Sequence, residues 1–181
     1  MPFAETPRLV IRRFQATDVA AFAAYRCDPE VARYQSWSPA MTMQEAAALV
    51  DEFATGDPDV PGWFQYAIAM RAADPVLIGD VGVHLHENMM QAEIGFTLNR
   101  QHQGHGYATE AVQAMLHHLF AYRRLKRVSA ECDARNSASA RLLQRVGFQR
   151  EGLRRQHTWI KGEWTDDLLF GLLAAEFPSA P

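Results

Sequence analysis

Apolar and polar residues alternate along several short segments of the chain, as they do in strands that bury one face. The clearest segment is 91–98, where Ala92, Ile94, Phe96 and Leu98 alternate with polar residues or glycine. The same alternation, bounded by turn residues, predicts further strands. They cover residues 9–14, 63–70, 76–85, 127–132, 150–160 and 163–173. The consecutive segments between 63 and 98 indicate an antiparallel meander.

Apolar residues at helical spacing predict helices between these strands. Thr42, followed three residues later by Glu45, forms a capping box for a helix that runs to about Phe53. Other helices are expected from Thr17 or Asp18 to about Cys27, from His105 onward and from Ser137 onward. This order of elements predicts the α/β class (α+β mixed): a single domain over residues 1–181, with a mostly antiparallel sheet and helices on both faces.

Composition and charge narrow the function classes. The 181 residues are 48% apolar, which suffices for a substantial core, and the net charge of −3 argues against direct nucleic-acid binding despite the local basic run at 123–127. No segment is long and apolar enough to suggest a membrane span. Cys27 and Cys132 form no Cys-x-x-Cys motif, and no signal peptide is recognisable, so we expect a reducing, cytoplasmic location.

A glycine-containing loop at 100–108 lies between the strand at 91–98 and the next helix. Gly104 and Gly106 let an anion approach the backbone, and the first N–H groups of a helix have no internal partner, so this junction predicts phosphate binding. A P-loop is excluded because Lys and Ser or Thr do not follow Gly106. The interpretation as a dinucleotide-binding site is weakened, because Thr109 stands where that motif has its third glycine. A plain glycine turn is a further alternative.

A second cluster lies downstream, where Asn136 is suited to cap a short helix that ends before Gly147. Together with Gln101-x-x-Gly104-x-Gly106, its spacing resembles the GNAT superfamily of N-acetyltransferases, which use acetyl-coenzyme A (acetyl-CoA). Further motifs resemble the branch containing the ribosomal-protein N-terminal (alanine/serine) acetyltransferases, and they span nearly the whole chain. They are Thr6-x-Arg8-Leu9-x-Ile11-Arg12, Asn136-x-x-Ser139, Gly147-Phe148, Glu151-Gly152 and Gly162-Glu163-Trp164-x-Asp166.

The resemblance implies how acetyl-CoA binds. In the family, the strand before the glycine loop splays from its neighbour, and the pantetheine arm of the cofactor pairs with its backbone. This role would belong to Phe96, Thr97 and Leu98, with an N–H near Leu98 polarising the thioester carbonyl. Asn136 would bind the arm, and the loop amides would bind the diphosphate. The loop residues are Gln103, Gly104, His105, Gly106, Tyr107 and Ala108.

The implied reaction is direct attack of a neutral amine on acetyl-CoA, which requires a base and stabilisation of the leaving thiolate. Many family members have a Tyr acid seven residues after the Asn, where this chain has Leu143. The resemblance therefore assigns thiolate stabilisation to Ser139, whose hydroxyl is a suitable donor. Glu93, on the polar face of the splayed strand, is the leading base. Glu87, Glu151, Glu163 and an ordered water remain alternatives.

The acceptor is expected to be a primary amine. An α-amine with a pKa of about 8 is partly neutral at cytosolic pH, whereas a lysine amine with a pKa of about 10.4 is almost fully charged. A site without a strong base therefore favours an N-terminal α-amine. Aromatic side chains would wall the acceptor pocket. The expected acceptor residues are Tyr34, Trp37, Trp63, Tyr66 and His84. His84 and His86 lack a third ligand at suitable spacing, so no metal is expected.

The sequence thus predicts an acetyl-CoA-dependent N-acetyltransferase that acts on a primary amine, with a protein N-terminus as the favoured acceptor. An enzyme that acetylates a small molecule, such as an antibiotic or a polyamine, would share the same chemistry. A non-catalytic acyl-CoA-binding module would need the loop and Asn136 but not Ser139, and a nucleotide-binding dehydrogenase is the remaining enzyme class. The sequence leaves open whether two chains form a homodimer.

Overall fold

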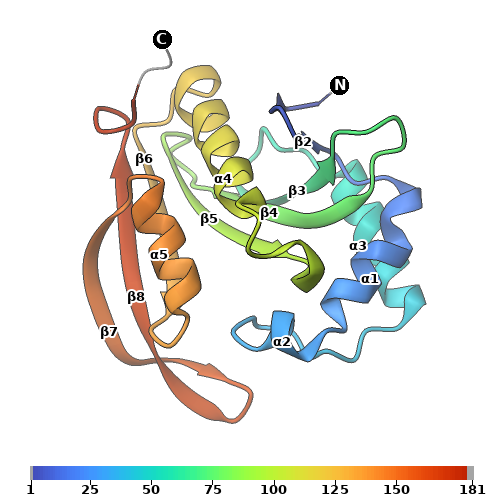
Figure 1. The fold of residues 1–181 in the computed structure, drawn as a ribbon. Helices are drawn as coiled ribbons and strands as arrows, with labels where there is room; N and C mark the ends of the chain where they lie inside the picture. Colours follow the sequence, from blue (N-terminus) through green and yellow to red (C-terminus); the bar gives the residue numbers. More distant parts are fainter. Residues whose placement is uncertain (1, 179–181) are drawn as a thin grey trace.

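The computed structural model describes residues 2–178 and contains an eight-stranded sheet flanked by helices (Figure 1). The strands lie in the order β1-β2-β3-β4-β5-β6-β8-β7, and only the β5–β6 pair in this sheet is parallel. Their bounds are β1 Ala4–Glu5, β2 Leu9–Arg12, β3 Gly62–Met70, β4 Leu77–Leu85, β5 Gln91–Leu98, β6 Arg127–Asp133, β7 Gln149–Ile160 and β8 Glu163–Leu173. The fold class expected from the alternation of apolar and polar residues is confirmed.

The helices lie between these strands in the chain. Their bounds are α1 Val19–Arg26, α2 Pro29–Ala32, α3 Met43–Thr55, α4 Tyr107–His117 and α5 Ser137–Arg145, with 3-10 turns at Ala16–Asp18 and Arg100–His102 and a π-helical turn at His118–Tyr122. The short elements β1 and α2 were not predicted, because two and four residues carry too little periodicity. Among the described helices, none has the length and apolar character that a bilayer crossing requires.

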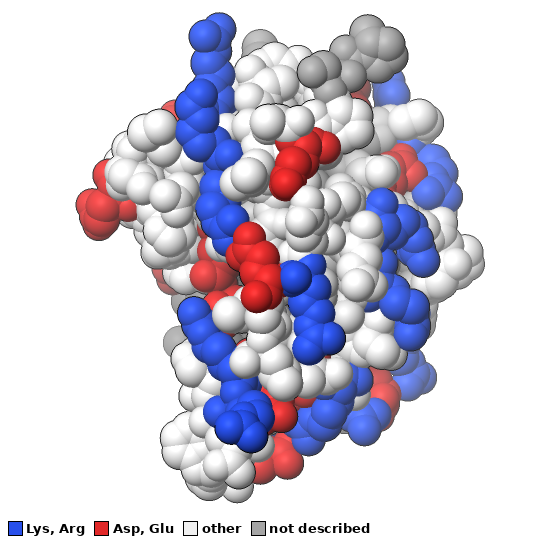
Figure 2. Space-filling model, turned by 90° about the vertical axis from the view of Figure 1, so that its left-hand side faces the viewer, with Lys and Arg blue, Asp and Glu red and all other residues white. Residues whose placement is uncertain are grey.

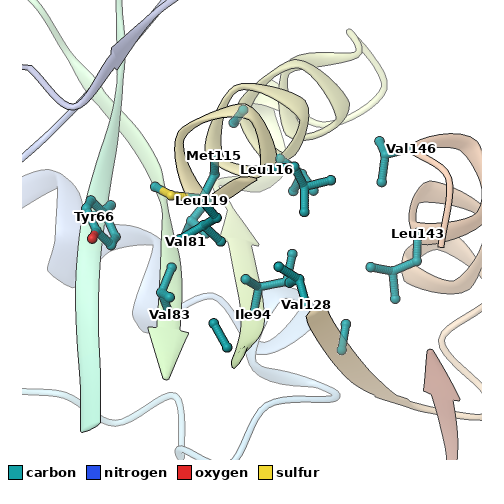
Figure 3. Packing of buried hydrophobic residues seen from close by; sticks show 14 of the residues in the cluster. Tyr66, Val81, Val83, Ile94, Met115, Leu116, Leu119, Val128, Leu143 and Val146 are labelled. Atoms are coloured by element: carbon teal, nitrogen blue, oxygen red, sulfur yellow. The ribbon is translucent and has the colours of Figure 1, made fainter. Parts of the chain in front are cut away.

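Helix α4 packs over the middle of the sheet and organises the larger core (Figure 3). Its Met115 and Leu116 are fully buried. They share this core with Val81 of β4, Ile94 of β5 and Val128 of β6. The apolar stripe of one helix therefore holds three neighbouring strands together.

A second core lies on the other face of the sheet, beneath α1 and α3. Phe22 and Tyr25 of α1 pack there with Val50 of α3. The strand residues that meet them are Ala67 and Leu77. Because α1 and α3 cover this face over β3 and β4, both faces of this part of the sheet are buried.

Two helix starts differ from expectation. The first helix begins with a 3-10 turn, and the Asp18 carboxylate accepts a 2.8 Å hydrogen bond from the N–H of Gln15 rather than capping α1. The same carboxylate forms a buried, two-pronged ion pair with Arg12, at 2.7 and 2.8 Å. Helix α4 begins at Tyr107 rather than His105, because left-handed Gly106 immediately precedes it.

Strands β5 and β6 pair only at their first residues. Gln91, Ala92 and Glu93 face Arg127, Val128 and Ser129, and no pairing follows along the described strands. Beyond this point β5 stays paired with β4 as far as Leu98, while β6 stays paired with β8 as far as Asp133. The two strands thus form a wedge that opens toward the glycine loop.

Basic and acidic side chains are interspersed on the side of the molecule where β7 forms the sheet edge (Figure 2). Two ion pairs contribute to this pattern, Arg127 with Glu151 at 2.8 Å and Arg154 with Glu131 at 2.8 Å. This side therefore presents mixed charge rather than a continuous basic surface.

Truncation of the α4 stripe tests the packing. Leu116→Ala should lower the free energy of unfolding by about 2–5 kcal/mol, because it leaves a cavity between α4 and the sheet. Leu173→Ala, at a position 43% exposed, is the matched control and should change it by less than about 0.5 kcal/mol. Urea unfolding followed by circular dichroism measures both. Equal losses in the two variants would contradict the assigned core.

Candidate active site

The glycine loop presents unpaired backbone donors at the open end of the wedge. Gly104 and Gly106 adopt positive φ angles of 80° and 81°, which other residue types rarely adopt. The N–H groups of residues 104–108 have no hydrogen-bond acceptor within the part of the chain that the structure describes. These donors and the N-terminus of α4 together form a site suited to a phosphate group.

Gln103 differs from the rest of the predicted loop. Its backbone N–H donates to the carbonyl of Arg100 at 3.2 Å, and its side-chain Nε2 donates to the carbonyl of Leu98 at 2.9 Å. Gln103 therefore braces the end of β5 against the loop. The expectation that its backbone amide is free for the diphosphate is wrong.

A cavity of about 540 Å³ adjoins the loop. It brings together the end of β5, the start of α4, residues of α5, and α2 with the segment that follows it. Of the predicted cofactor residues, the lining includes Phe96, Thr97, Leu98, Gln103, Gly104, Gly106, Tyr107, Ala108 and Asn136, together with Ser139. His105 does not line it: the imidazole stacks on the Tyr107 ring, with centroids 5.8 Å apart.

Three polar side chains reach this cavity from α5 and its N-cap, namely Asn136, Ser139 and Arg145. Asn136 caps the helix, with Oδ1 accepting a 3.1 Å hydrogen bond from the N–H of Ser139. The NH₂ group of Asn136 and the hydroxyl of Ser139 form no hydrogen bond with any group among residues 2–178. Leu143 is 1% exposed and packs in the core. A polar acid could not replace it without disturbing that packing. Of the two donors that α5 itself offers to the cavity, Ser139 lies in the first turn beside Asn136, whereas Arg145 lies at the far end of the helix.

Glu93 lies on the opposite face of the sheet from α4. Its neighbours Ala92 and Ile94 point into the α4 core, so the alternation of β5 directs Glu93 the other way. Glu93 pairs with Ser129 at the last bonded register of the wedge and faces His84 on β4. Partial burial raises the pKa of Glu93, and the charge of Glu131 raises it further, against smaller lowering effects of His84 and other cationic groups. The narrow end of the wedge thus holds a carboxyl with raised proton affinity.

The five predicted acceptor residues do not form one pocket. Tyr34 lines the cavity, and Trp63 is 56% exposed and packs against His84 with tilted rings whose centroids are 5.2 Å apart. The Trp37 indole covers the guanidinium of Arg26, whose Cζ lies 3.7 Å from the ring centre. Tyr66 lies inside the α4 core, where burial raises its pKa to about 12. Trp63 and Tyr66 are an odd number of positions apart on β3, so they face opposite sides of the sheet.

Sequence reasoning missed a polar cluster on the same face as Glu93. Glu131, His157 and Asp167 each contribute one side-chain oxygen or nitrogen atom that could bind a metal, and these three atoms lie within 4.8 Å of one another. Asp167 Oδ2 lies 3.1 Å from His157 Nδ1 and accepts a 2.6 Å hydrogen bond from the Thr158 hydroxyl. Alternation along β6 places Glu131 on the side of Ser129 and Glu93, and this signal was available in the sequence.

His157 could not be placed from the sequence, because it lies in a bulge of β7. Arg154 pairs with Asp167 and Thr158 pairs with Thr165, so four residue steps on β7 face two on β8. Gln156 within the bulge has a φ of 47°. A bulge re-aims nearby side chains, and a simple strand pattern does not predict its position.

The fold and the cavity together define an acyltransferase class. The mostly antiparallel sheet is incompatible with the doubly wound parallel sheet of dinucleotide-binding dehydrogenases. The family model described as "Acetyltransferase (GNAT) domain" matches residues 8–149, and the chain belongs to this family. It is an acetyl-CoA-dependent N-acetyltransferase, with acetyl-CoA as the co-substrate, and the dehydrogenase and non-catalytic alternatives are therefore set aside.

Named relatives agree with this assignment. An uncharacterized N-acetyltransferase, p20, of Bacillus licheniformis is 32% identical over 174 residues, or 95% of this chain and 96% of that protein. The ribosomal-protein-serine acetyltransferase of Escherichia coli is 33% identical over 95 residues, or 52% of this chain and 53% of that protein. Among solved structures, a GNAT-family acetyltransferase from Bacillus anthracis superposes with a TM-score of 0.86 at 26% identity, covering 96% of this chain and 99% of that one.

Proposed function

We propose that this protein transfers the acetyl group of acetyl-CoA to a primary amine by direct attack in a ternary complex, with residues 1–181 acting as one catalytic domain. The favoured acceptor is a protein N-terminal α-amine. The observation that carries the proposal is the convergence of the unpaired loop amides, Asn136 and Ser139 on one cavity at the open end of the wedge.

In this proposal the donor binds mainly through backbone groups. The diphosphate accepts hydrogen bonds from the N–H groups of residues 104–108, and the pantetheine arm extends along the unpaired edge of β5 at Phe96, Thr97 and Leu98. The free amide of Asn136 bonds the arm from the α5 side. An N–H near Leu98 polarises the thioester carbonyl. The thioester then lies deep in the wedge, close to the face that carries Glu93.

The amine approaches from the face opposite α4. The neutral amine attacks the thioester carbonyl, and Glu93 takes the proton that the nitrogen loses as the new bond forms. The carbon–nitrogen bond forms, the carbon–sulfur bond breaks, and the Ser139 hydroxyl donates a hydrogen bond to the departing thiolate. An α-amine suits this site because a single carboxylate is a weak base and a large part of an α-amine population is already neutral near pH 8.

A small-molecule polyamine is the second candidate acceptor. The carboxylates of Glu93, Glu131 and Asp167 share the acceptor-side face and would attract an additional cation. Arg154 and His157 offset part of this negative charge. The α-amine therefore stays the favoured acceptor.

A direct comparison of acceptors tests the proposal. The acceptors are a lysine-free peptide with a free N-terminus, an N-terminally blocked peptide with one lysine, and spermidine. We expect the highest kcat/KM for the free N-terminus, measured by release of the CoA thiol and by product mass. Turnover of spermidine alone would identify a polyamine as the acceptor, and turnover of the lysine peptide alone would identify a lysine side chain.

Gly106→Asp should abolish the stabilisation of the protein by CoA, because it strains a left-handed position and puts negative charge at the diphosphate site. The matched control is Gly162→Asp, since Gly162 has a φ of 85° in the β7–β8 turn and does not line the cavity. Thermal shift with and without CoA measures both. Retained stabilisation in Gly106→Asp would count against the loop as the diphosphate site.

Ser139→Ala should keep the thermal shift with CoA and lower kcat about 10–100-fold, since a hydrogen bond to a charged group contributes about 1.5–3 kcal/mol. Ser137→Ala is the control, because Ser137 begins the same helix but does not line the cavity. Steady-state thiol release gives kcat for both variants. An unchanged kcat in Ser139→Ala would remove Ser139 from the mechanism.

Glu93→Gln should lower kcat/KM about 100-fold or more, as expected for loss of a general base. In the wild type, Glu93 must be ionised to accept a proton. Because its pKa is raised, the decrease of kcat/KM on the acidic side of the pH profile should occur at a higher pH than for an ordinary glutamate. This decrease should be absent in Glu93→Gln. Glu87→Gln, in the exposed β4–β5 turn, should retain the wild-type profile. A wild-type profile in Glu93→Gln would show that another group is the base.

A further inference from the structure

The opening Thr6-x-Arg8-Leu9 motif has no part in the mechanism proposed above. Leu9 is fully buried and pairs with Met70 at the start of β2. Thr6 and Arg8 instead reach across to Glu110 in the first turn of α4. The Thr6 hydroxyl donates to Glu110 Oε1 at 2.5 Å, and Arg8 Nε donates to Glu110 Oε2 at 2.6 Å. The backbone N–H of Arg8 completes the contact with a 3.2 Å bond to Oε1.

Arg8 also contacts the glycine loop, although it does not line the cavity. Its Nη1 donates a 3.0 Å hydrogen bond to the backbone carbonyl of His105. The guanidinium carbon lies 4.5 Å from the centre of the Tyr107 ring. A Cβ built on Gly106 would lie 3.5 Å from Nη2. One side chain therefore touches three successive residues of the loop.

The bond to His105 has a geometric consequence for the next residue. In a trans peptide, the C=O and the following N–H point in opposite directions. Arg8 holds the His105 carbonyl on its own side, so the N–H of Gly106 must point away from Arg8. Gly106 lines the cavity, and its N–H is one of the unpaired donors. Without this bond, a loop with two glycines at positive φ could rotate that peptide group at little cost.

Glu110 keeps Arg8 in this position. Burial alone would raise the pKa of Glu110, but the hydrogen bonds from Thr6 and Arg8 outweigh it and hold the pKa below its usual value. Glu110 is therefore ionised at neutral pH and binds Arg8 as a charged pair. Its place in the first turn of α4 also suits the helix dipole.

We propose that Thr6, Arg8 and Glu110 form a latch that orients the glycine loop for the diphosphate of the donor, with Arg8 as the positioning residue. This inference rests on the proposed function, which places the diphosphate at residues 104–108. The latch acts only on the diphosphate part of the donor. Its loss should therefore weaken ligands that carry a diphosphate and leave ligands that lack one unaffected.

The experiment compares CoA with pantetheine, which lacks the nucleotide and the diphosphate. We expect Arg8→Ala to raise the Kd for CoA about tenfold, measured by titration calorimetry. The Kd for pantetheine, measured by NMR titration, should stay within about twofold of the wild type. Arg8→Lys keeps the charge but loses the planar fork, so it should restore part of the CoA affinity.

Two further variants make the result specific. Arg150→Ala is the matched control, because Arg150 is exposed on β7 and has no bonded side-chain partner within residues 2–178; it should bind both ligands as the wild type does. Thr6→Val has a similar shape but lacks the hydroxyl that bonds Glu110, so it tests the latch even where Arg8→Ala folds poorly. It should weaken CoA about threefold.

Three outcomes would overturn the latch. The first is unchanged CoA affinity in both Arg8→Ala and Thr6→Val. The second is an equal loss of affinity for CoA and pantetheine, which would indicate general loss of structure. The third is a wild-type protein that binds pantetheine and CoA equally, which would remove the diphosphate from the loop and so overturn the proposed donor site as well.

Discussion

Parallel pairing between β5 and β6 lasts for three residues on each strand, and the inner edges of both strands are then left without a neighbour. Backbone N–H and C=O groups that lack a partner must bond to water or to a ligand. The wedge therefore creates a need for hydrogen bonds inside an otherwise continuous sheet. An extended molecule with amide groups can supply these hydrogen bonds as an added strand would. An acetyl donor that binds to the backbone of the strands therefore suits this fold.

The wedge persists because each strand is secured on its outer side. β5 remains paired with β4, and β6 remains paired with β8, beyond the point where they separate. The α4 residue Leu116 joins Ile94 and Val128 in one core at the narrow end. Helix α4 thus holds the two strands together at one end. At the other end, its N-terminus adds hydrogen-bond donors to those of the loop. The packing of the sheet and the proposed binding of acetyl-CoA therefore depend on the same helix.

The sequence was sufficient for features that depend on local pattern. Alternation located the long strands, the Thr42 and Glu45 pair located the start of α3, and the two glycines located the loop. Features that depend on contacts between distant segments were missed. Arg8 meets His105 across 97 positions, and no pattern in either segment announces that bond. The predicted acceptor pocket was wrong, and the sequence already contained the reason. Trp63 and Tyr66 are an odd number of positions apart on one strand, so they cannot share a face.

The two sides of the wedge place different demands on the sequence. On the donor side, the groups that would meet acetyl-CoA are largely backbone N–H groups, so glycine positions and a bond such as that from Arg8 to His105 matter more than the lining side chains. On the other face, Glu93, Glu131, His157 and Asp167 come from four different strands, and a bulge sets the position of His157. In the proposed mechanism, a substitution there would change the chemistry that an acceptor meets. The donor can therefore be inferred from the fold and loop, whereas the proposed acceptor side is built from side chains of several strands that the fold alone does not specify.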